Sequence, residues 1–202
     1  MALSFKPKIS VCVPTHAMDH ADYFLGRLKD SLDQQTFRDF ELIITKEGKM
    51  AENTNAAIKK ASGEIIKILY MDDFLFSRNA LQRLVDNFKG GWYASACVHT
   101  YDGFLFEEPH MPSYNSDIRS GNNTIGSPSV IAFENNKPLL FDENLSWLLD
   151  CDLYARLYDR YGEPTLCTDL DIAIGKGFHQ MTYKLTDMEK ESEFTYLKHK
   201  YA

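Results

Sequence analysis

The sequence predicts an α/β fold in which helices flank a mostly parallel central sheet. Apolar, β-branched runs alternate with helical patterns, with strands expected at 9–14, 40–45 and 64–71 and helices at about 19–34 and 51–61. Strands joined by helices in this way normally lie parallel in one sheet. The composition, with 44% hydrophobic and 25% charged residues, is that of an ordinary globular domain. We therefore expect a single domain.

The first strand and the first helix each depend on a local pattern. Pro14 ends the strand, because proline lacks the N–H that a strand interior needs, and the next residues open a loop. In the helix, Leu25, Leu28 and Leu32 repeat at i, i+3 and i+7, which places them on one face. Ser62-Gly63 is the stop signal of the second helix.

The strand at 64–71 is the most informative stretch, because it ends in the adjacent carboxylates Asp72 and Asp73. Lys67 is the only charge inside its apolar run, so we expect burial on both faces of the sheet. Open α/β sheets bind ligands at the carboxyl ends of their strands. Two acids there repel each other unless a cation lies beside them. The pattern therefore predicts a divalent cation that carries a phosphorylated ligand.

The second half of the chain is less regular. Ser77 is expected to cap a helix that ends at Gly90-Gly91, and 92–100 is expected to be a strand. The polar stretch 101–128 is long enough to be a functional loop or a lid. Further elements are predicted as a strand at 129–133, a helix to about residue 161 and a helical tail from 186.

Charge and composition exclude several classes of protein. The chain has 22 Lys and Arg against 29 Asp and Glu, which gives a net charge of −7. This negative charge and the lack of a basic cluster argue against nucleic acid and anionic membranes as partners. No signal peptide or membrane span is predicted, and the four cysteines lack C-x-x-C spacing, so we expect a cytoplasmic protein with free thiols. Neither the dinucleotide nor the P-loop glycine motif occurs.

Six short motifs follow one another along about residues 8–182. They are Ser10-Val11-Cys12-Val13-Pro14-Thr15, Asn55-Ala56-Ala57-Ile58 through Ala61-Ser62-Gly63-Glu64, Met71-Asp72-Asp73, Gly126-Ser127-Pro128-Ser129, Phe141-Asp142-Glu143 with Asp150-Cys151-Asp152, and His179-Gln180-Met181-Thr182. In this order they resemble the family 2 glycosyltransferases of GT-A fold. The resemblance implies one GT-A-like (Rossmann-like) domain that transfers a sugar, with inversion, from a nucleotide diphosphate sugar to an acceptor hydroxyl. A UDP-sugar is the expected donor.

The resemblance also implies roles for particular residues. Asp73 would ligate the cation, Mn²⁺ or Mg²⁺, with Asp72 on the ribose or the same cation and with His179 as a further metal ligand. Asp150 would be the catalytic base, because a carboxylate can take the proton of an attacking alcohol. The nucleoside would be bound by Pro14, Thr15, Glu47, Asn55 and Asp72.

Simpler explanations exist for some of these residues. Asp150 precedes a helix, where Asp is a good N-cap, His179 is equally explained as a structural or surface residue, and Asn55 as an amide on a helix surface. The family usually has Asp-Asp-Gly-Ser around Glu47 and often Glu at Leu149. These departures leave open a non-catalytic GT-A-like binding module. A sugar nucleotidyltransferase is a further alternative, although its glycine-rich basic loop is missing.

The predicted organisation assigns one task to each part of the domain 1–202. Residues of about 1–91 would form the nucleotide-sugar-binding half, about 92–185 the acceptor and catalytic half, and 186–202 a C-terminal helical tail. The acceptor would be a saccharide or another hydroxyl compound. Because the chain is small, an acceptor platform would come from a partner or from a second copy in a homo-oligomer.

Overall fold

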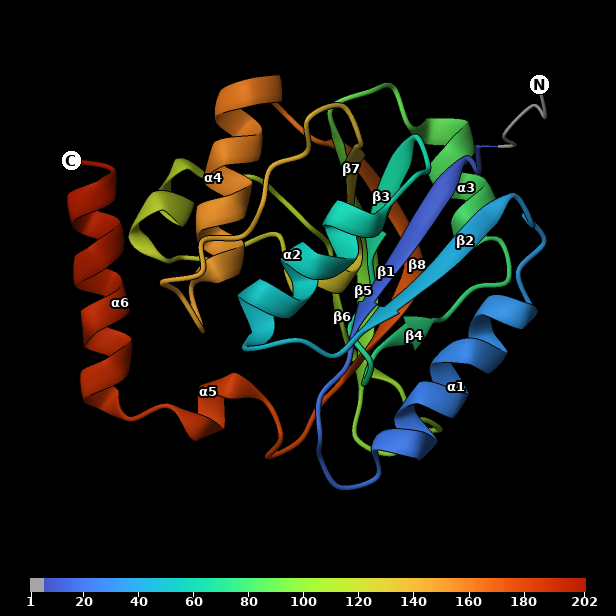
Figure 1. Cartoon of the computed structure of the whole chain (residues 1–202), viewed down its shortest axis with the longest axis horizontal. Coiled ribbons are helices and arrows are strands. Elements are labelled where there is room, and N and C mark those ends of the chain that lie inside the picture. Colours follow the sequence, from blue (N-terminus) through green and yellow to red (C-terminus); the bar gives the residue numbers. More distant parts are fainter. Residues whose placement is uncertain (1–5) are drawn as a thin grey trace.

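An eight-stranded sheet runs through residues 6–202, the part of the chain that the computed structural model describes (Figure 1). Its strand order is β2-β1-β3-β7-β5-β8-β4, with β6 paired to β5. The strands are β1 (Ile9–Pro14), β2 (Phe40–Thr45), β3 (Ile65–Ile68), β4 (Phe74–Leu75), β5 (Trp92–Thr100), β6 (Glu107–His110), β7 (Ile131–Glu134) and β8 (Thr165–Gly175). The helices are α1 (Ala21–Asp33), α2 (Met50–Lys60), α3 (Ala80–Asn87), α4 (Leu149–Tyr161), α5 (Met181–Lys184) and α6 (Asp187–Lys200), with short 3-10 helices η1 (Ser116–Ser120) and η2 (Pro128–Val130).

The strands β1, β2, β3, β5 and β8 point in one direction. Strand β1 is parallel to both β2 and β3, and β5 is parallel to β8. Strand β7 lies between β3 and β5 and is antiparallel to both, which joins the two parallel groups. The predicted α/β fold with a mostly parallel sheet is therefore confirmed.

The direction of these strands brings their carboxyl ends to one edge of the molecule. In Figure 1 this is the lower end, where the loops after β1 and β8 and the short helix α5 are found. Helix α2 packs against β1 and β2, and α3 packs against β8. Helix α6 lies at the outer side, in contact with η1 and with the first turn of α4.

Strand β3 is buried on both faces, as its apolar sequence predicts. The lysine in its centre, Lys67, is 4% exposed and donates hydrogen bonds to the carbonyl oxygens of Ser129 and Ile131. Burial lowers the pKa of Lys67 to about 7. These hydrogen bonds fix the segment before β7 to the middle of the sheet.

Several features differ from the sequence-based expectation, including the short strands β4 and β6, the second of which lies within the stretch 101–128. Strand β3 stops at Ile68, because residues 70–73 form a turn in which Asp73 N–H donates to Tyr70 O. Helix α3 begins at Ala80, with Asn79 rather than Ser77 at its N-cap position. Strand β8 was not predicted, because its first half alternates polar residues with exposed apolar ones and only its second half is buried.

Candidate active site

The turn that carries both acids packs against the end of β8. Gly175 N–H donates to Asp73 Oδ1 at 2.8 Å. A Cβ atom on residue 175 would lie only 2.5 Å from Asp72 O, so the two backbones approach as closely as a glycine allows. The guanidinium of Arg27, on α1, donates to the same Asp72 oxygen at 2.7 Å. The last residue of β8 and the first helix therefore hold the turn in place.

The Asp73 side chain points into the protein and not toward solvent. It is 2% exposed, and its second oxygen lies 3.4 Å from Ser127 Oγ. Burial, and then the charge of Asp72, raise the pKa of Asp73 well above its usual range. Asp73, the predicted metal ligand, thus binds the backbone of Gly175 and helps to fix the turn.

Asp72 instead faces the edge of the sheet, where it meets His179. Asp72 Oδ2 and His179 Nε2 are 2.8 Å apart, and the side chains are 17% and 19% exposed. The His179 ring packs against Phe24 of α1, with ring centroids 5.5 Å apart. His16, in the loop after β1, lies near the pair, and burial lowers its pKa while Asp72 opposes that effect. The structure therefore brings together the carboxylate and the histidine that the sequence singled out.

The Asp72–His179 pair fits part of a divalent-cation site. Residues 6–202 contain no group of three or more His, Cys, Asp or Glu side chains placed to hold a metal. Ions that bind with substrate phosphates commonly take only one or two protein ligands. Neighbouring ligands of an octahedral ion lie about 3 Å apart, close to the spacing of this pair. The imidazole nitrogen favours a transition-metal ion such as Mn²⁺ over Mg²⁺.

Asp150 lies in the first turn of α4 and is half-buried. Its Oδ2 accepts a hydrogen bond from Asn123 Nδ2 at 2.7 Å, and its Oδ1 accepts one from Cys151 N–H at 2.6 Å. Burial raises the pKa of Asp150 to about 6, against the opposing effect of these hydrogen bonds. The N-cap position belongs to Leu148, so Asp150 is not the N-cap. A carboxylate whose pKa lies near neutrality can serve as a general base.

Tyr70 connects the two carboxylates in space. It follows β3, and its backbone N–H donates to Ser129 Oγ at 2.8 Å. Burial raises the pKa of its hydroxyl, and the negative charges of Asp150, Asp73 and Asp72 raise it further. The charges of Asp72 and Asp150 therefore both act on Tyr70.

Two asparagines that hold this region together were missed by the sequence analysis. Asn123 binds Asp150 and also donates to Gly126 O at 2.9 Å, while its Oδ1 accepts from two backbone N–H groups. Asn53, on α2, donates to Thr15 O at 2.8 Å and accepts from Glu47 N–H at 2.9 Å. Asn side chains commonly bind nearby backbone groups in this way, and that turn chemistry is the only sequence signal that either residue carries.

Pro14 and Thr15 lie at the carboxyl end of β1. Pro14 is the last residue of the strand and pairs with Thr45 of β2. The Thr15 hydroxyl donates to Thr45 O at 2.8 Å. These two predicted donor residues are thus at the same edge of the sheet as the turn that carries Asp72.

The side chains of Glu47 and Asn55 bind partners other than Asp72 and His179. Glu47 is exposed, forms an ion pair with Lys60 at 2.7 Å and lines an open hollow of about 460 Å³ that neither Asp72 nor His179 borders. Asn55 is 1% exposed, and its amide donates to Phe141 O and Glu143 Oε1, both at 2.9 Å. Asn55 therefore fixes the segment before α4, and the structure does not bring it to the edge of the sheet.

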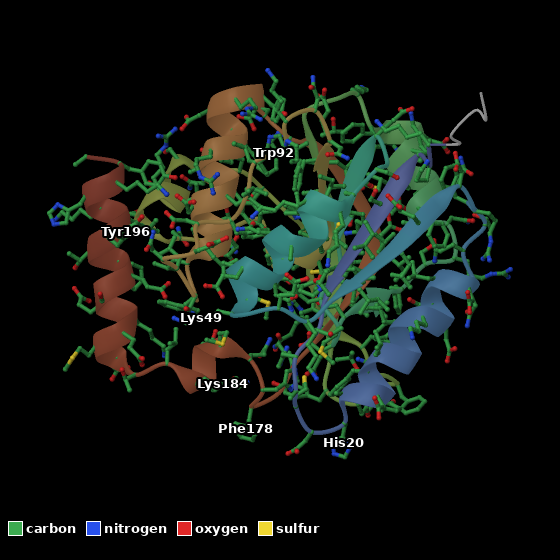
Figure 2. The ribbon with its side chains drawn as sticks, in the orientation of Figure 1. His20, Lys49, Trp92, Phe178, Lys184 and Tyr196 are labelled. Carbon is green, nitrogen blue, oxygen red and sulfur yellow. The ribbon has the colours of Figure 1, made fainter. Side chains whose placement is uncertain are left out.

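Side chains from several loops surround this edge. Figure 2 shows His20 of the loop after β1, Phe178 of the loop after β8 and Lys184 of α5 at the same lower end of the molecule. Phe178 is 89% exposed. The segments beside Asp72 thus come from both ends of the sequence.

Comparisons with known proteins support the fold. No protein-family model matches the sequence, and no curated protein sequence matches it significantly. The crystal structure of S. aureus TarS 1-349 in complex with UDP-GlcNAc superposes with a TM-score of 0.67 at 16% identity, covering 94% of this chain and 65% of that one. The same protein with UDP gives 0.64 at 15% identity, covering 85% and 61%. The mannosyltransferase PcManGT from Pyrobaculum calidifontis in complex with GDP-Man and Mn2+ gives 0.58 at 16% identity, covering 89% and 59%.

These matches define the class of fold. The chain has the GT-A-like fold of glycosyltransferases, and the resemblance to family 2 is consistent with it. It spans 65% of the TarS chain in the UDP-GlcNAc complex and 61% in the UDP complex, which is less than two thirds of that length. None of the helices within residues 6–202 is long and apolar enough to cross a membrane.

Proposed function

We propose that this protein is an inverting, metal-dependent glycosyltransferase that moves a sugar from a nucleotide diphosphate sugar to an acceptor hydroxyl. UDP-sugars are the first donors to test. The observation that carries the proposal is the placement of the Asp72–His179 pair at the carboxyl edge of a GT-A-like sheet. The half-buried carboxylate of Asp150 and the carboxylate of Asp72 both act on Tyr70. Open α/β sheets bind their ligands at this edge. Structures of the same fold contain UDP, UDP-GlcNAc and GDP-Man with Mn2+.

Asp72 and His179 would hold the divalent cation, and Asp73 would position the turn without touching it. A bound cation neutralises the charge that develops on a diphosphate leaving group. Pro14 and Thr15 would contact the nucleoside, because they end the neighbouring strand. The roles suggested for Glu47 and Asn55 are not part of this proposal, since their side chains are engaged elsewhere.

Asp150 would act as the general base. Its carboxylate takes the proton of the acceptor hydroxyl as the oxygen forms a bond to the anomeric carbon of the donor sugar. The bond from that carbon to the diphosphate breaks at the same time, and the electron pair leaves with the phosphate oxygen. Attack from the face opposite the leaving group inverts the configuration at the anomeric carbon. Asn123 keeps the carboxylate oriented for this step.

The proposed organisation is one domain with the donor bound by residues of about 1–91 and the acceptor by residues of about 92–185. The polar segment 101–128 would help to form the acceptor side, because it supplies Asn123, which binds Asp150. The acceptor would be a saccharide or another hydroxyl compound, with a partner or a second copy completing its platform.

Thermal unfolding with nucleoside diphosphates, each with and without Mn²⁺, tests the donor site. A ligand at about 100 times its Kd adds about 2.7 kcal/mol to the free energy of unfolding. For a domain of this size that raises the Tm by several degrees. We expect one nucleotide to give this shift only with the metal, and we expect Asp72→Ala and His179→Ala to remove it.

The matched control is His199→Ala, which changes an exposed histidine on α6 and should leave the shift intact. A shift that survives in Asp72→Ala would contradict the assignment of the metal ligands. If no nucleotide shifts the Tm of the unaltered protein under any metal condition, the proposed donor site is wrong.

A further inference from the structure

The start of α4, the helix that carries Asp150, has no cap of its own. Its N-cap residue is Leu148, an apolar side chain that cannot accept a hydrogen bond. The backbone N–H groups at a helix start need acceptors, and a local Ser, Thr, Asp or Asn normally supplies one. Here the acceptor comes from a helix far along the chain.

Glu193 of α6 binds three successive backbone N–H groups before α4. Its Oε1 accepts from Ser146 N–H at 2.8 Å, and its Oε2 accepts from Trp147 N–H at 2.9 Å and from Leu148 N–H at 2.8 Å. A carboxylate at the start of a helix also interacts favourably with the helix dipole. Glu193 therefore fixes the backbone that leads into α4, and among its three donors Leu148 N–H belongs to the N-cap residue of the helix.

Contacts of residues that follow Glu193 along α6 help to fix its position. Phe194 packs edge-to-face on Trp147, with ring centroids 5.4 Å apart. Further along α6, Lys200 Nζ lies 2.5 Å from Asp142 Oδ2 and 2.7 Å from Asp152 Oδ1. The helix is thus bound to the segment before α4 and to α4 itself, so the Glu193 carboxylate is held against the N–H groups that it binds.

Asp150 follows Leu148 by two residues, so the backbone that Glu193 fixes is the one that aims the Asp150 side chain. The other groups around Asp150 are Asn123 from the 101–128 segment, Cys151 and Tyr154 from α4, and Tyr70 after β3. Burial raises the pKa of Cys151, Tyr154 and Tyr70, so all three are neutral at pH 7. Asp72 and Asp73 act from beyond Tyr70, and Glu193 contributes a negative charge at the start of the helix.

We infer that Glu193 is a positioning residue for Asp150, which holds the start of α4 so that the carboxylate is aimed at the acceptor hydroxyl. This inference rests on the proposed function, because it assigns Asp150 the role of base. Glu193 touches backbone N–H groups and not the reacting atoms, and its effect passes through the helix. The C-terminal segment thus serves both carboxylates, with His179 beside Asp72 and Glu193 behind Asp150.

The test compares Glu193→Gln and Glu193→Ala with the unaltered protein in two measurements. The first is an NMR titration of the Asp150 carboxyl, which needs no turnover. In Glu193→Gln, the loss of a nearby negative charge should lower its midpoint by about half a pH unit. The second is transfer at pH 7, where misaiming of the base should lower kcat about tenfold with the donor KM unchanged. Glu193→Ala, which also loses the hydrogen bonds, should show the larger loss of rate.

Glu191→Gln is the matched control, because Glu191 is exposed on the same helix. It should match the unaltered protein in both measurements. Glu193→Gln keeps the side-chain shape and guards against a folding defect in Glu193→Ala. An Asp150 midpoint that equals that of the unaltered protein in Glu193→Gln overturns the inference. If the unaltered protein transfers no sugar, the proposed function fails, and the titration still decides whether Glu193 acts on the Asp150 carboxyl.

Discussion

Asp72 and Asp150 are the same side chain in two different environments. Asp72 lies on a turn and pairs with an imidazole, whereas Asp150 lies in a helix and pairs with the neutral amide of Asn123. Burial raises the pKa of Asp150 to about 6, so a proton can bind to and leave it near neutral pH. In the proposed function, these surroundings would suit Asp72 to a cation and Asp150 to proton transfer. Each can be altered without the other.

Asp150→Asn should give the largest loss of activity and leave the Asp72–His179 pair intact. An amide of the same shape cannot take the proton of the acceptor, so kcat should fall by about 10³-fold. The metal-dependent thermal shift with the nucleotide should persist, since Asp72 and His179 are unchanged. Sugar transfer and thermal unfolding on the same preparation measure both.

Asp159→Asn is the control for that substitution, because Asp159 lies on the same helix in an exposed ion pair with Arg119. Its rate should equal that of the unaltered protein. Full turnover in Asp150→Asn would mean that another group takes the proton. A thermal shift with no turnover in the unaltered protein would favour a non-catalytic binding module.

Gly175→Ala should displace the turn that carries Asp72 and leave the surroundings of Asp150 unchanged. The added methyl group would lie 2.5 Å from Asp72 O, so the turn has to move. We expect a loss of about 2 kcal/mol in the free energy of unfolding, typical of an overpacked site, together with a weaker metal-dependent thermal shift. Urea unfolding and thermal unfolding with the nucleotide check the two effects.

Gly26→Ala is the matched control within the same protein. No atom lies within 4 Å of the Cβ that it would add, and Gly26 is inside α1, where alanine is the better helix former. It should be as stable as the unaltered protein or more so. Equal stability of Gly175→Ala and Gly26→Ala would show that the close approach of the two backbones does not matter.

The pH dependence should give the smallest effect. Asp150 works as a base only without its proton, so kcat/KM should fall about tenfold for each pH unit below about 6. Stability should change with pH in the opposite direction to the rate. Because folding raises the pKa of Asp150, its contribution to the free energy of unfolding grows as pH falls through about 6. Rates and unfolding free energies between pH 5 and 7.5 measure both slopes. A flat rate profile in that range would remove Asp150 from the chemistry.

The sequence predicted the parts of the site that depend on local pattern. The apolar run of β3 and its carboxylate end were readable because burial and β-branching occur within a few residues. Which of the two acids faces outward was not readable. That choice depends on Gly175, which is 102 positions further on, and on His179, which is 107 positions from Asp72.

Asn53 and Asn55 illustrate the same limit within one helix. They are two positions apart and so point to nearly opposite sides of α2. Asn53 faces the ends of β1 and β2, and Asn55 faces the segment before α4. Composition alone cannot decide between them, because both faces of the helix are buried and both segments offer backbone partners. Only the packing of the whole domain selects the residue at the edge of the sheet.

The place of the C-terminal segment in the chain has a consequence for biosynthesis. Synthesis proceeds from the N-terminus, and all the strands of the sheet are complete once Gly175 has been made. At that moment Asp72 lacks the imidazole that lies beside it, and the start of α4 lacks the carboxylate that binds its N–H groups, because His179 and Glu193 follow later. A product truncated after residue 175 would therefore carry every strand of the domain and an unfinished site.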